Sequence, residues 1–180
     1  MAIRDIHMWP SPALRGVAKE VDGMSDDDIE LIHDMIETMR DSSGLGISAP
    51  QVGVLKRIIV IDDKKTREGI LPERDPTVMI NPEIIDGFGE MAVEEGCLSL
   101  PGQFVIIPRA SHITVRYRTV DGESRESDVD GVTAVILQHE IDHLDGKLII
   151  DRLFPEARAK AEWDMFSVQN TEKLSKPQHI

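Results

Sequence analysis

The stretch Gln138-His139-Glu140-Ile141-Asp142-His143 contains two histidines four residues apart, with a glutamate directly after the first. This spacing matches the H-E-x-x-H pattern. Residues four apart lie on the same face of an α-helix, so both imidazoles can reach one cation, and Glu140 lies beside them to take a proton from water. The alternative interpretation is a surface helix that carries two histidines without a metal. The pattern favours a metal centre built on a helix.

The flanking residues favour a helix around this stretch. Asp130 is suited to the N-cap, and Gly146 is well placed to end the helix. The apolar residues between them are spaced as a stripe that should be buried: Val132, Val135, Ile136 and Leu144. The motif is therefore expected on a capped, amphipathic helix.

The length and charge of the chain limit the classes of protein to which it can belong. A chain of 180 residues can bury most of its apolar surface in one domain. We expect a single domain over residues 1–180, in which residues 156–180 form a C-terminal helix and a frayed tail. The net charge of −13 argues against a protein that holds DNA or RNA through phosphate contacts.

The sequence also favours a cytoplasmic protein. The first residues contain no apolar stretch of the kind that forms a secretory signal, and the apolar runs elsewhere are too short to cross a membrane. Cys97 is the single cysteine, which excludes an intramolecular disulfide and suits a reducing compartment.

Helical spacing also appears near the start of the chain. Ser25 with Asp28 three residues later resembles a capping box and predicts a helix start. The residues expected to face the core are Ile29, Ile32, Ile36 and Met39. His33 has no partner at metal-ligand spacing, so we interpret it as a surface residue. The glycines and proline between Gly44 and Gly53 predict a loop whose bare backbone groups are available to a peptide or a partner strand.

Strand patterns occupy the middle of the chain. The expected segments are a buried strand at Arg57–Asp62, a surface excursion at 63–76, an edge strand at Val78–Ile85 because Pro82 interrupts it, a strand at Phe104–Ile107, a half-buried strand with Ile113, Val115 and Tyr117 inward, a hairpin turn at Asp121-Gly122 and a short strand or extended segment at Lys147–Ile150. The pattern predicts an α+β fold, with mainly antiparallel sheets packed around a central helix that carries the motif.

A catalytic metal site usually has three protein ligands and an open position. A downstream glutamate, Glu156 or Glu162, is one possible third ligand. Cys97 is the better candidate, because a lone thiol between Gly96 and Ser99 at a turn is a natural soft ligand. The competing interpretation of Cys97 is a buried cysteine that acts as a small hydrophobe.

Three segments together decide between these alternatives. They are Gly44-Leu45-Gly46-Ile47-Ser48-Ala49-Pro50-Gln51, Glu95-Gly96-Cys97-Leu98-Ser99 and Gln138-His139-Glu140-Ile141-Asp142-His143-Leu144-Asp145-Gly146. In order and approximate spacing they resemble the three motifs of peptide deformylase, and the resemblance extends from Pro12 to about Leu153. Ser48 departs from the pattern, since the family usually has alanine there. The change is small for small and is expected to add a hydroxyl near the site.

The resemblance implies one divalent metal ion held by Cys97, His139 and His143, with water in the fourth position. Deformylases are typically iron(II) enzymes, so Fe²⁺ is the expected native ion, and Zn²⁺, Ni²⁺ or Co²⁺ are alternatives that thiolate and imidazole also suit. Glu140 would take the proton of the attacking water and then protonate the departing amine. The substrates implied are N-formyl-methionyl nascent peptides, from which formate is released.

The resemblance also assigns roles to residues around the metal. The Gln51 side chain and the backbone N–H of Leu98 would stabilise the oxyanion. An extended substrate would add as a strand near Gly44, Leu45, Gly46 and Gly96. Val135 and Ile136 are candidate walls of a methionine pocket. Glu95 either pairs with Arg109 to brace the Cys97 loop or is a solvated surface charge.

Two rival functions use the same residues differently. A zinc endopeptidase would use His139, His143 and a downstream glutamate, with a structural Cys97. A metal-stabilised interaction module has no use for Glu140. From Glu156 to Ile180 the four acids and four bases cancel, so transient ribosome proximity is expected without strong basic docking.

Overall fold

The computed structural model describes residues 2–62 and 76–175, with side chains to residue 167. The helices are α1 (Asp26–Asp41), α2 (Gly131–Leu144) and α3 (Pro155–Ser175), with short 3-10 turns η1 (Pro12–Arg15), η2 (Ala49–Val52) and η4 (Ile149–Arg152). The strands are β1 (Gly46–Ser48), β2 (Ile58–Ile61), β3 (Thr77–Phe88), β4 (Met91–Gly96), β5 (Phe104–Arg109), β6 (His112–Arg118) and β7 (Ser124–Asp130). The predicted α+β class is confirmed.

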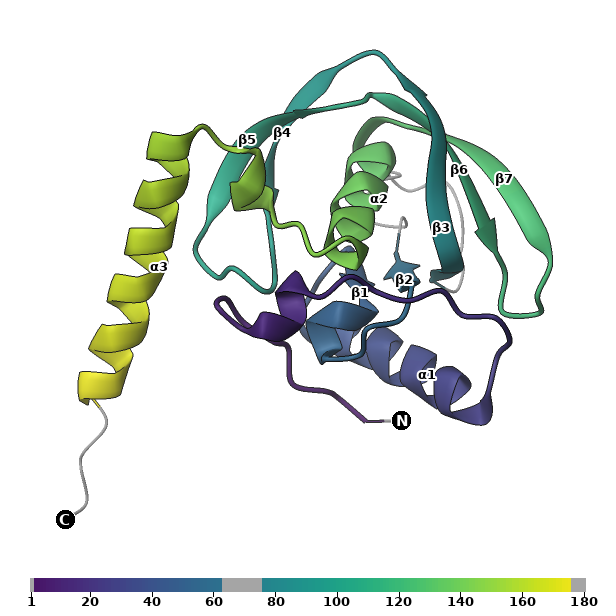
Figure 1. Cartoon of the computed structure of the whole chain (residues 1–180), viewed down its shortest axis with the longest axis horizontal. Helices are drawn as coiled ribbons and strands as arrows, with labels where there is room; N and C mark the ends of the chain where they lie inside the picture. The colour runs from purple at the N-terminus through teal and green to yellow at the C-terminus, as the bar shows by residue number, and fades with distance from the viewer. Residues whose placement is uncertain (1, 63–75, 176–180) are drawn as a thin grey trace.

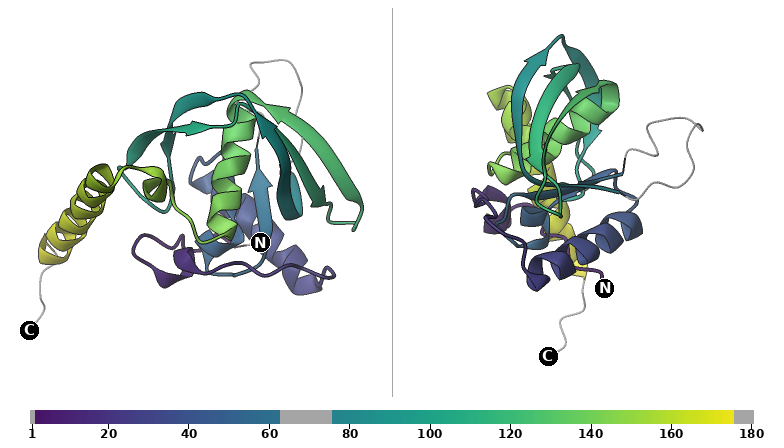
Figure 2. Two further views of the ribbon diagram at one scale, coloured as in Figure 1. Left: turned by 45° about the horizontal axis from the view of Figure 1, so that its top comes forward. Right: turned by 90° about the vertical axis from the view of Figure 1, so that its right-hand side faces the viewer.

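The strands form two antiparallel sheets. One has five strands in the order β1-β2-β3-β6-β7, and the other is the hairpin β4-β5. Figure 1 shows α2 at the centre of the molecule, with the strands curving over it and α1 below, while α3 extends away from the body. The two turned views in Figure 2 show the same central position of α2. None of the helices among the described residues combines the length and apolarity needed to cross a membrane.

The start of α1 follows the predicted capping box. The Asp28 carboxylate accepts hydrogen bonds from the backbone N–H of Ser25 at 3.1 Å and from its hydroxyl at 2.7 Å, and the Ser25 hydroxyl oxygen accepts from the Asp28 N–H at 3.3 Å. The predicted core face needs correction. Ile32 and Met39 are buried, but Ile29 and Ile36 are only half-buried, because the buried face also runs through Leu31, Met35 and Thr38. His33 is exposed, as predicted.

The prediction of an edge strand around Pro82 is wrong. β3 is the central strand of the larger sheet, with β2 on one side and β6 on the other. Its pairing with β6 shifts register between Ile80 and Glu83, so Pro82 lies in an irregularity where the regular ladder is interrupted. Asn81 beside it adopts a left-handed φ of 52° and is held by hydrogen bonds to both backbone groups of Val21.

Three further predictions differ from the structure. The expected loop at 44–53 is partly regular, because it contains β1 and η2. The segment Lys147–Ile150, expected as a short strand or extended segment, forms no strand: Leu148 is extended, and Ile149 begins the 3-10 turn η4. Val132, expected in the buried stripe of α2, is 44% exposed, because it lies in the first turn of the helix at the rim of a cleft. The predicted excursion lies outside the described residues apart from Pro76, as do the last five residues.

The helix that carries the motif begins and ends as predicted. Asp130 is the N-cap residue by position, although its side chain makes no capping hydrogen bond. Gly146, two residues after the last helical residue, has a φ of +71° that favours glycine. One side of α2 packs on the larger sheet through Ala134, Leu137 and Leu144. The motif residues are thereby held on the part of the helix that faces β1 and the β4-β5 hairpin.

Candidate active site

Cys97, His139 and His143 come together in space. One possible ligand atom from each lies within 4.8 Å of the others, and the Cys97 sulfur is 3.2 Å from Nε2 of His143. Both histidines are buried on α2, and Cys97 follows the end of β4. A thiol and two imidazoles are the donor set that first-row transition ions prefer, so these residues fit one such cation.

A carboxylate fixes the orientation of His139. Nδ1 of His139 donates a hydrogen bond to the Glu95 carboxylate at 2.9 Å, which leaves its other ring nitrogen for the cluster. Burial lowers the pKa of His139, but hydrogen bonds to Cys97 and Glu95 outweigh it and raise the pKa to about 10 in the metal-free protein. Burial, together with the charge of His139, lowers the pKa of His143 well below its ordinary value.

Of the two alternatives for Glu95, the structure has the pair with Arg109. The guanidinium donates two hydrogen bonds to the Glu95 carboxylate, at 2.7 and 2.9 Å, and the Arg109 side chain is completely buried. Its third bond, at 2.6 Å, goes to Asp142 on α2. Asp142 is in turn chelated by Arg152 of η4 at 2.7 and 2.6 Å. These bonds connect both the β4-β5 hairpin and η4 to α2.

Asp142 and Arg152 are functional-site neighbours that the sequence analysis missed. Asp142 lies inside the H-E-x-x-H stretch, in a helix segment that is otherwise buried. A charged residue inside a buried helix segment requires a buried partner, and that signal was available in the sequence. The sequence did not show which residues are the partners, because Arg109 and Arg152 approach from distant parts of the chain.

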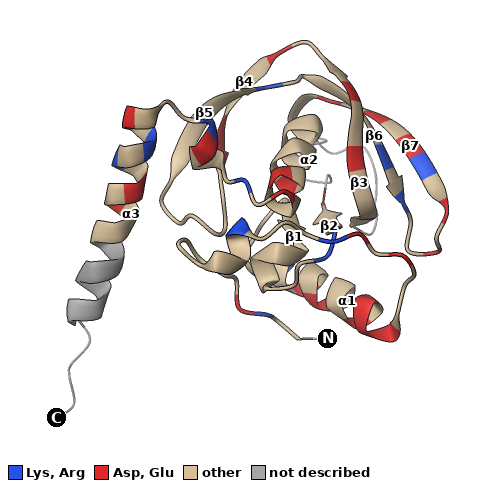
Figure 3. Ribbon diagram, viewed as in Figure 1, with Lys and Arg blue, Asp and Glu red and all other residues tan. Residues whose placement is uncertain are grey.

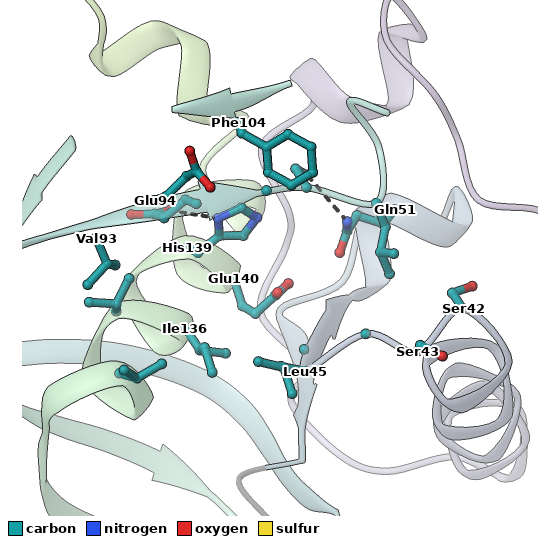
Figure 4. A pocket seen from close by; sticks show the side chains of 18 of the residues that line it. Ser42, Ser43, Leu45, Gln51, Val93, Glu94, Phe104, Ile136, His139 and Glu140 are labelled. Carbon is teal, nitrogen blue, oxygen red and sulfur yellow. Dashed lines mark hydrogen bonds and ion pairs between the residues drawn. The ribbon is translucent and has the colours of Figure 1, made fainter. Parts of the chain in front are cut away.

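Glu140 is buried with one unpartnered oxygen. Its side chain lies beside Gly46, where an added Cβ would be 2.6 Å from Oε1. The other oxygen, Oε2, has no hydrogen-bond partner among the described residues. Burial raises the pKa of Glu140 to about 7, although the charge of His139 and a hydrogen bond with Ser48 oppose the shift. Figure 4 shows Glu140 between His139 and Leu45, which directly precedes β1.

Gln51 reaches the same centre from η2. Its amide oxygen accepts hydrogen bonds from the Ser48 backbone N–H at 2.9 Å and from the Ser48 hydroxyl at 3.0 Å. Its amide nitrogen donates to the Ser99 hydroxyl at 3.3 Å and lies 3.9 Å from the Cys97 sulfur. Gln51 is 1% exposed, so its amide is held inside the protein at this centre.

Some of these residues line an open cleft of about 620 Å³: Gln51, Glu95, Cys97, His139 and Glu140. The residues expected to contact substrate or to bound its pocket all line this cleft: Gly44, Leu45, Gly46, Gly96, Leu98, Val135 and Ile136. Phe104 of β5, which the sequence analysis did not single out, lies above the cleft against Gly96 (Figure 4). The cleft is mostly apolar, which suits a substrate with an apolar side chain.

The family model for polypeptide deformylases matches residues 3–159. The chain belongs to the polypeptide deformylase family. The peptide deformylase of Alkalilimnicola ehrlichii is 48% identical over 155 residues, which cover 85% of this chain and 83% of that protein. The peptide deformylase of Tolumonas auensis is 40% identical over 176 residues, or 98% of each chain.

Solved deformylase structures have the same fold. The crystal structure of the Legionella pneumophila deformylase matches with a TM-score of 0.86 at 39% identity and covers 98% of this chain and 100% of its own. The Ehrlichia chaffeensis deformylase in complex with actinonin matches with a TM-score of 0.84 at 34% identity, over 98% of this chain and 100% of its own.

Membership of the deformylase family establishes the activity. The chain is a metal-dependent hydrolase that removes the N-formyl group from nascent peptides. The endopeptidase alternative, with a glutamate downstream of the motif as third ligand, is not favoured. Within the described residues, the cluster able to hold a metal contains Cys97 and neither Glu156 nor Glu162.

Proposed function

We propose that this deformylase uses one Fe²⁺ ion held by Cys97, His139 and His143, with Glu140 as the group that moves protons. The observation that carries the proposal is the cluster of the half-buried Cys97 thiol and two buried imidazoles, with the unpartnered Glu140 oxygen beside it. Zn²⁺, Ni²⁺ and Co²⁺ suit the same donors. When bound, such an ion polarises the formyl carbonyl and lowers the pKa of a water molecule.

Glu140 acts first as a base and then as an acid. It accepts the proton of the water that attacks the formyl carbon, and it delivers a proton to the amine as the C–N bond breaks. A group with both tasks works best when its pKa is near the working pH. The burial that raises the pKa of Glu140 to about 7 supports this assignment.

Two donors stabilise the oxyanion. We assign these to the Gln51 amide nitrogen and the backbone N–H of Leu98, each lowering the barrier by roughly 2–4 kcal/mol. The orientation of Gln51 supports its role, because both hydrogen bonds to its oxygen come from Ser48 and its nitrogen is turned toward Cys97. Leu98 directly follows the proposed thiolate ligand and lines the cleft.

The substrate lies extended in the cleft. We propose that the nascent chain adds as a strand beside Gly44, Leu45 and Gly46 on one side and Gly96 on the other, where backbone groups are accessible. The methionine side chain then packs against the α2 residues Val135 and Ile136. These residues are buried or half-buried and apolar, as a methionine pocket requires.

Residues 1–180 are proposed to act as one catalytic domain that includes α3. A free thiol and a ferrous ion both require reducing conditions, which favours the cytoplasm. Nascent peptides bring the enzyme transiently to the ribosome, without strong docking through the tail.

A formate-release assay on formyl-Met-Ala-Ser tests the proposal. The protein is purified under argon, loaded in turn with iron, nickel, cobalt or zinc, and assayed for formate and for internal peptide cleavage. We expect formate without internal cleavage. Inactivity with all four ions would overturn the proposal, and internal cleavage would favour the endopeptidase. If Fe²⁺ is native, activity should decay faster in air than under argon, because thiolate-bound ferrous iron oxidises readily. Equal half-lives in the two atmospheres would exclude iron.

A further inference from the structure

We propose that the hydroxyl of Ser48 is a positioning group that holds the Gln51 amide with its nitrogen turned toward the Cys97 loop. Ser48 is the last residue of β1 and is completely buried. The inference rests on the oxyanion role proposed for Gln51.

The two ends of a primary amide differ in their hydrogen bonding. The oxygen only accepts hydrogen bonds, and the nitrogen only donates them. Ser48 offers two donors to the oxygen of Gln51, its backbone N–H at 2.9 Å and its hydroxyl at 3.0 Å. The hydroxyl has a single proton, for which the Glu140 carboxylate also competes. With that proton on Gln51, both lone pairs of the amide oxygen are filled. The amide nitrogen is therefore directed to the opposite side.

The opposite side is the Cys97 loop. There the amide nitrogen donates to the Ser99 hydroxyl at 3.3 Å and lies 3.9 Å from the Cys97 sulfur. A reversed amide would bring its NH₂ group against the Ser48 N–H and remove the donor from the cleft. Because Gln51 and Ser48 are both buried, water cannot replace a lost partner without cost.

Alanine at this position would keep one of the two donors. The backbone N–H would remain, but the second lone pair of a buried oxygen would lose its partner, and the Gln51 amide would be held less firmly. A neutral hydrogen bond of this kind corresponds to roughly a three- to tenfold change in rate. The effect belongs to kcat rather than KM, because the oxyanion forms only in the transition state.

The test is a double-mutant cycle on the metal-loaded full chain. It compares the original protein with Ser48→Ala, Gln51→Leu and the double variant, using formyl-Met-Ala-Ser as substrate. We expect Ser48→Ala to lower kcat by about three- to tenfold with KM and metal content unchanged. In the Gln51→Leu background the same substitution should have no further effect on kcat, because the group it positions is already gone.

Thr38→Val is the matched control for loss of a buried hydroxyl. Thr38 is 1% exposed, its hydroxyl donates to the Asp34 carbonyl at 2.7 Å, and it lies on α1 away from the cleft. This variant should lose stability and keep kcat. Ser48→Thr, which restores the hydroxyl, should recover kcat relative to Ser48→Ala.

The outcomes separate this inference from the function on which it rests. An unchanged kcat in Ser48→Ala, or an equal loss in both backgrounds of the cycle, would overturn the positioning role while leaving Gln51 in place. Full activity in Gln51→Leu would instead overturn the oxyanion role of Gln51, and the inference with it.

Discussion

Gly46 leaves room for the Glu140 carboxylate, and no larger residue would. An added Cβ would lie 2.6 Å from Oε1 of Glu140 and 3.0 Å from its Cγ and Cδ. The fold should survive Gly46→Ala, because the end of a side chain can move aside. Catalysis should fall on the order of 10²-fold in kcat, because the proton-moving group is displaced. Formate release and metal content, measured together, check this expectation.

Gly23→Ala is the control for this substitution. Gly23 has no atom within 4 Å of an added Cβ, so the change should leave kcat unaltered. A Gly46→Ala variant with the kcat of the original protein would show that Glu140 does not need its present position.

At the scale of single residues, the sequence identified the side chains that carry the chemistry but not how all of them are oriented. Cys97, Glu140 and both histidines were predicted from local spacing and family motifs, and the structure brings them together. The completion of the Glu95–Arg109 pair by Asp142 was not predictable, because burial alone decides whether such charges pair or face solvent. The direction of the Gln51 amide likewise depends on tertiary contacts with Ser48.

The β4-β5 hairpin is tied to α2 by one buried guanidinium. Arg109→Met would leave the carboxylates of Glu95 and Asp142 buried without their shared partner. We expect the free energy of unfolding to fall by about 3–5 kcal/mol, measured by denaturant titration. The matched control is Arg116→Met on the sheet surface, where the side chain is 53% exposed and pairs with Glu126. Its cost should stay under about 1 kcal/mol. Equal costs would contradict the bracing role of Arg109.

The first turn of α1 should make the free energy of unfolding depend on pH in the acidic range. Burial opposes ionisation of Asp28, but hydrogen bonds from Lys56 and Ser25 outweigh it and hold the pKa of this carboxyl below its ordinary value of 3.8. A lowered folded pKa stabilises the protein above the unfolded value, and this contribution is lost as pH falls below 3.8 through the folded pKa.

Asp28→Asn should therefore destabilise the protein at neutral pH by about 1–2 kcal/mol, with the difference from the original protein shrinking in acid. Thermal melts across pH measure this. Asp27→Asn, an exposed neighbour in the same turn, controls for the loss of charge at the helix start. A constant difference at every pH would contradict the ionised pairing of Asp28 with Lys56.

At the scale of elements, periodicity identified the helices and most strands. It failed where tertiary pairing decides the structure. Pro82 indicated an edge strand by its missing N–H, but a register shift lets β3 occupy the centre of the sheet. Glycine-rich sequence indicated a loop at 44–53, yet pairing with β2 makes part of it a strand. Such contacts join residues too distant for local patterns to reveal.

Charges over the whole molecule argue against electrostatic docking to the ribosome. Figure 3 shows acids and bases side by side on α3. Arg158 pairs with Glu162 at 2.9 Å, and Lys160 pairs with Asp164 at 2.6 Å, on a protein of net charge −13. We expect no tail-dependent, salt-sensitive co-sedimentation with ribosomes. Replacing Glu156 and Asp164 by lysine should create salt-sensitive co-sedimentation with ribosomes, so this double variant is the positive control. Association of the unaltered protein that salt abolishes would contradict the expectation.

We assign metal binding and proton transfer to different residues. The most direct test is the metal-to-protein ratio of Glu140→Gln, measured together with its formate release after loading with Fe²⁺ under argon. We predict the metal content of the original protein, with activity lower by at least about 10²-fold, because the ligands remain and the proton-moving group is lost. Cys97→Ala in parallel should lose both metal and activity. Loss of the metal from Glu140→Gln, or full metal content and activity in Cys97→Ala, would contradict the account.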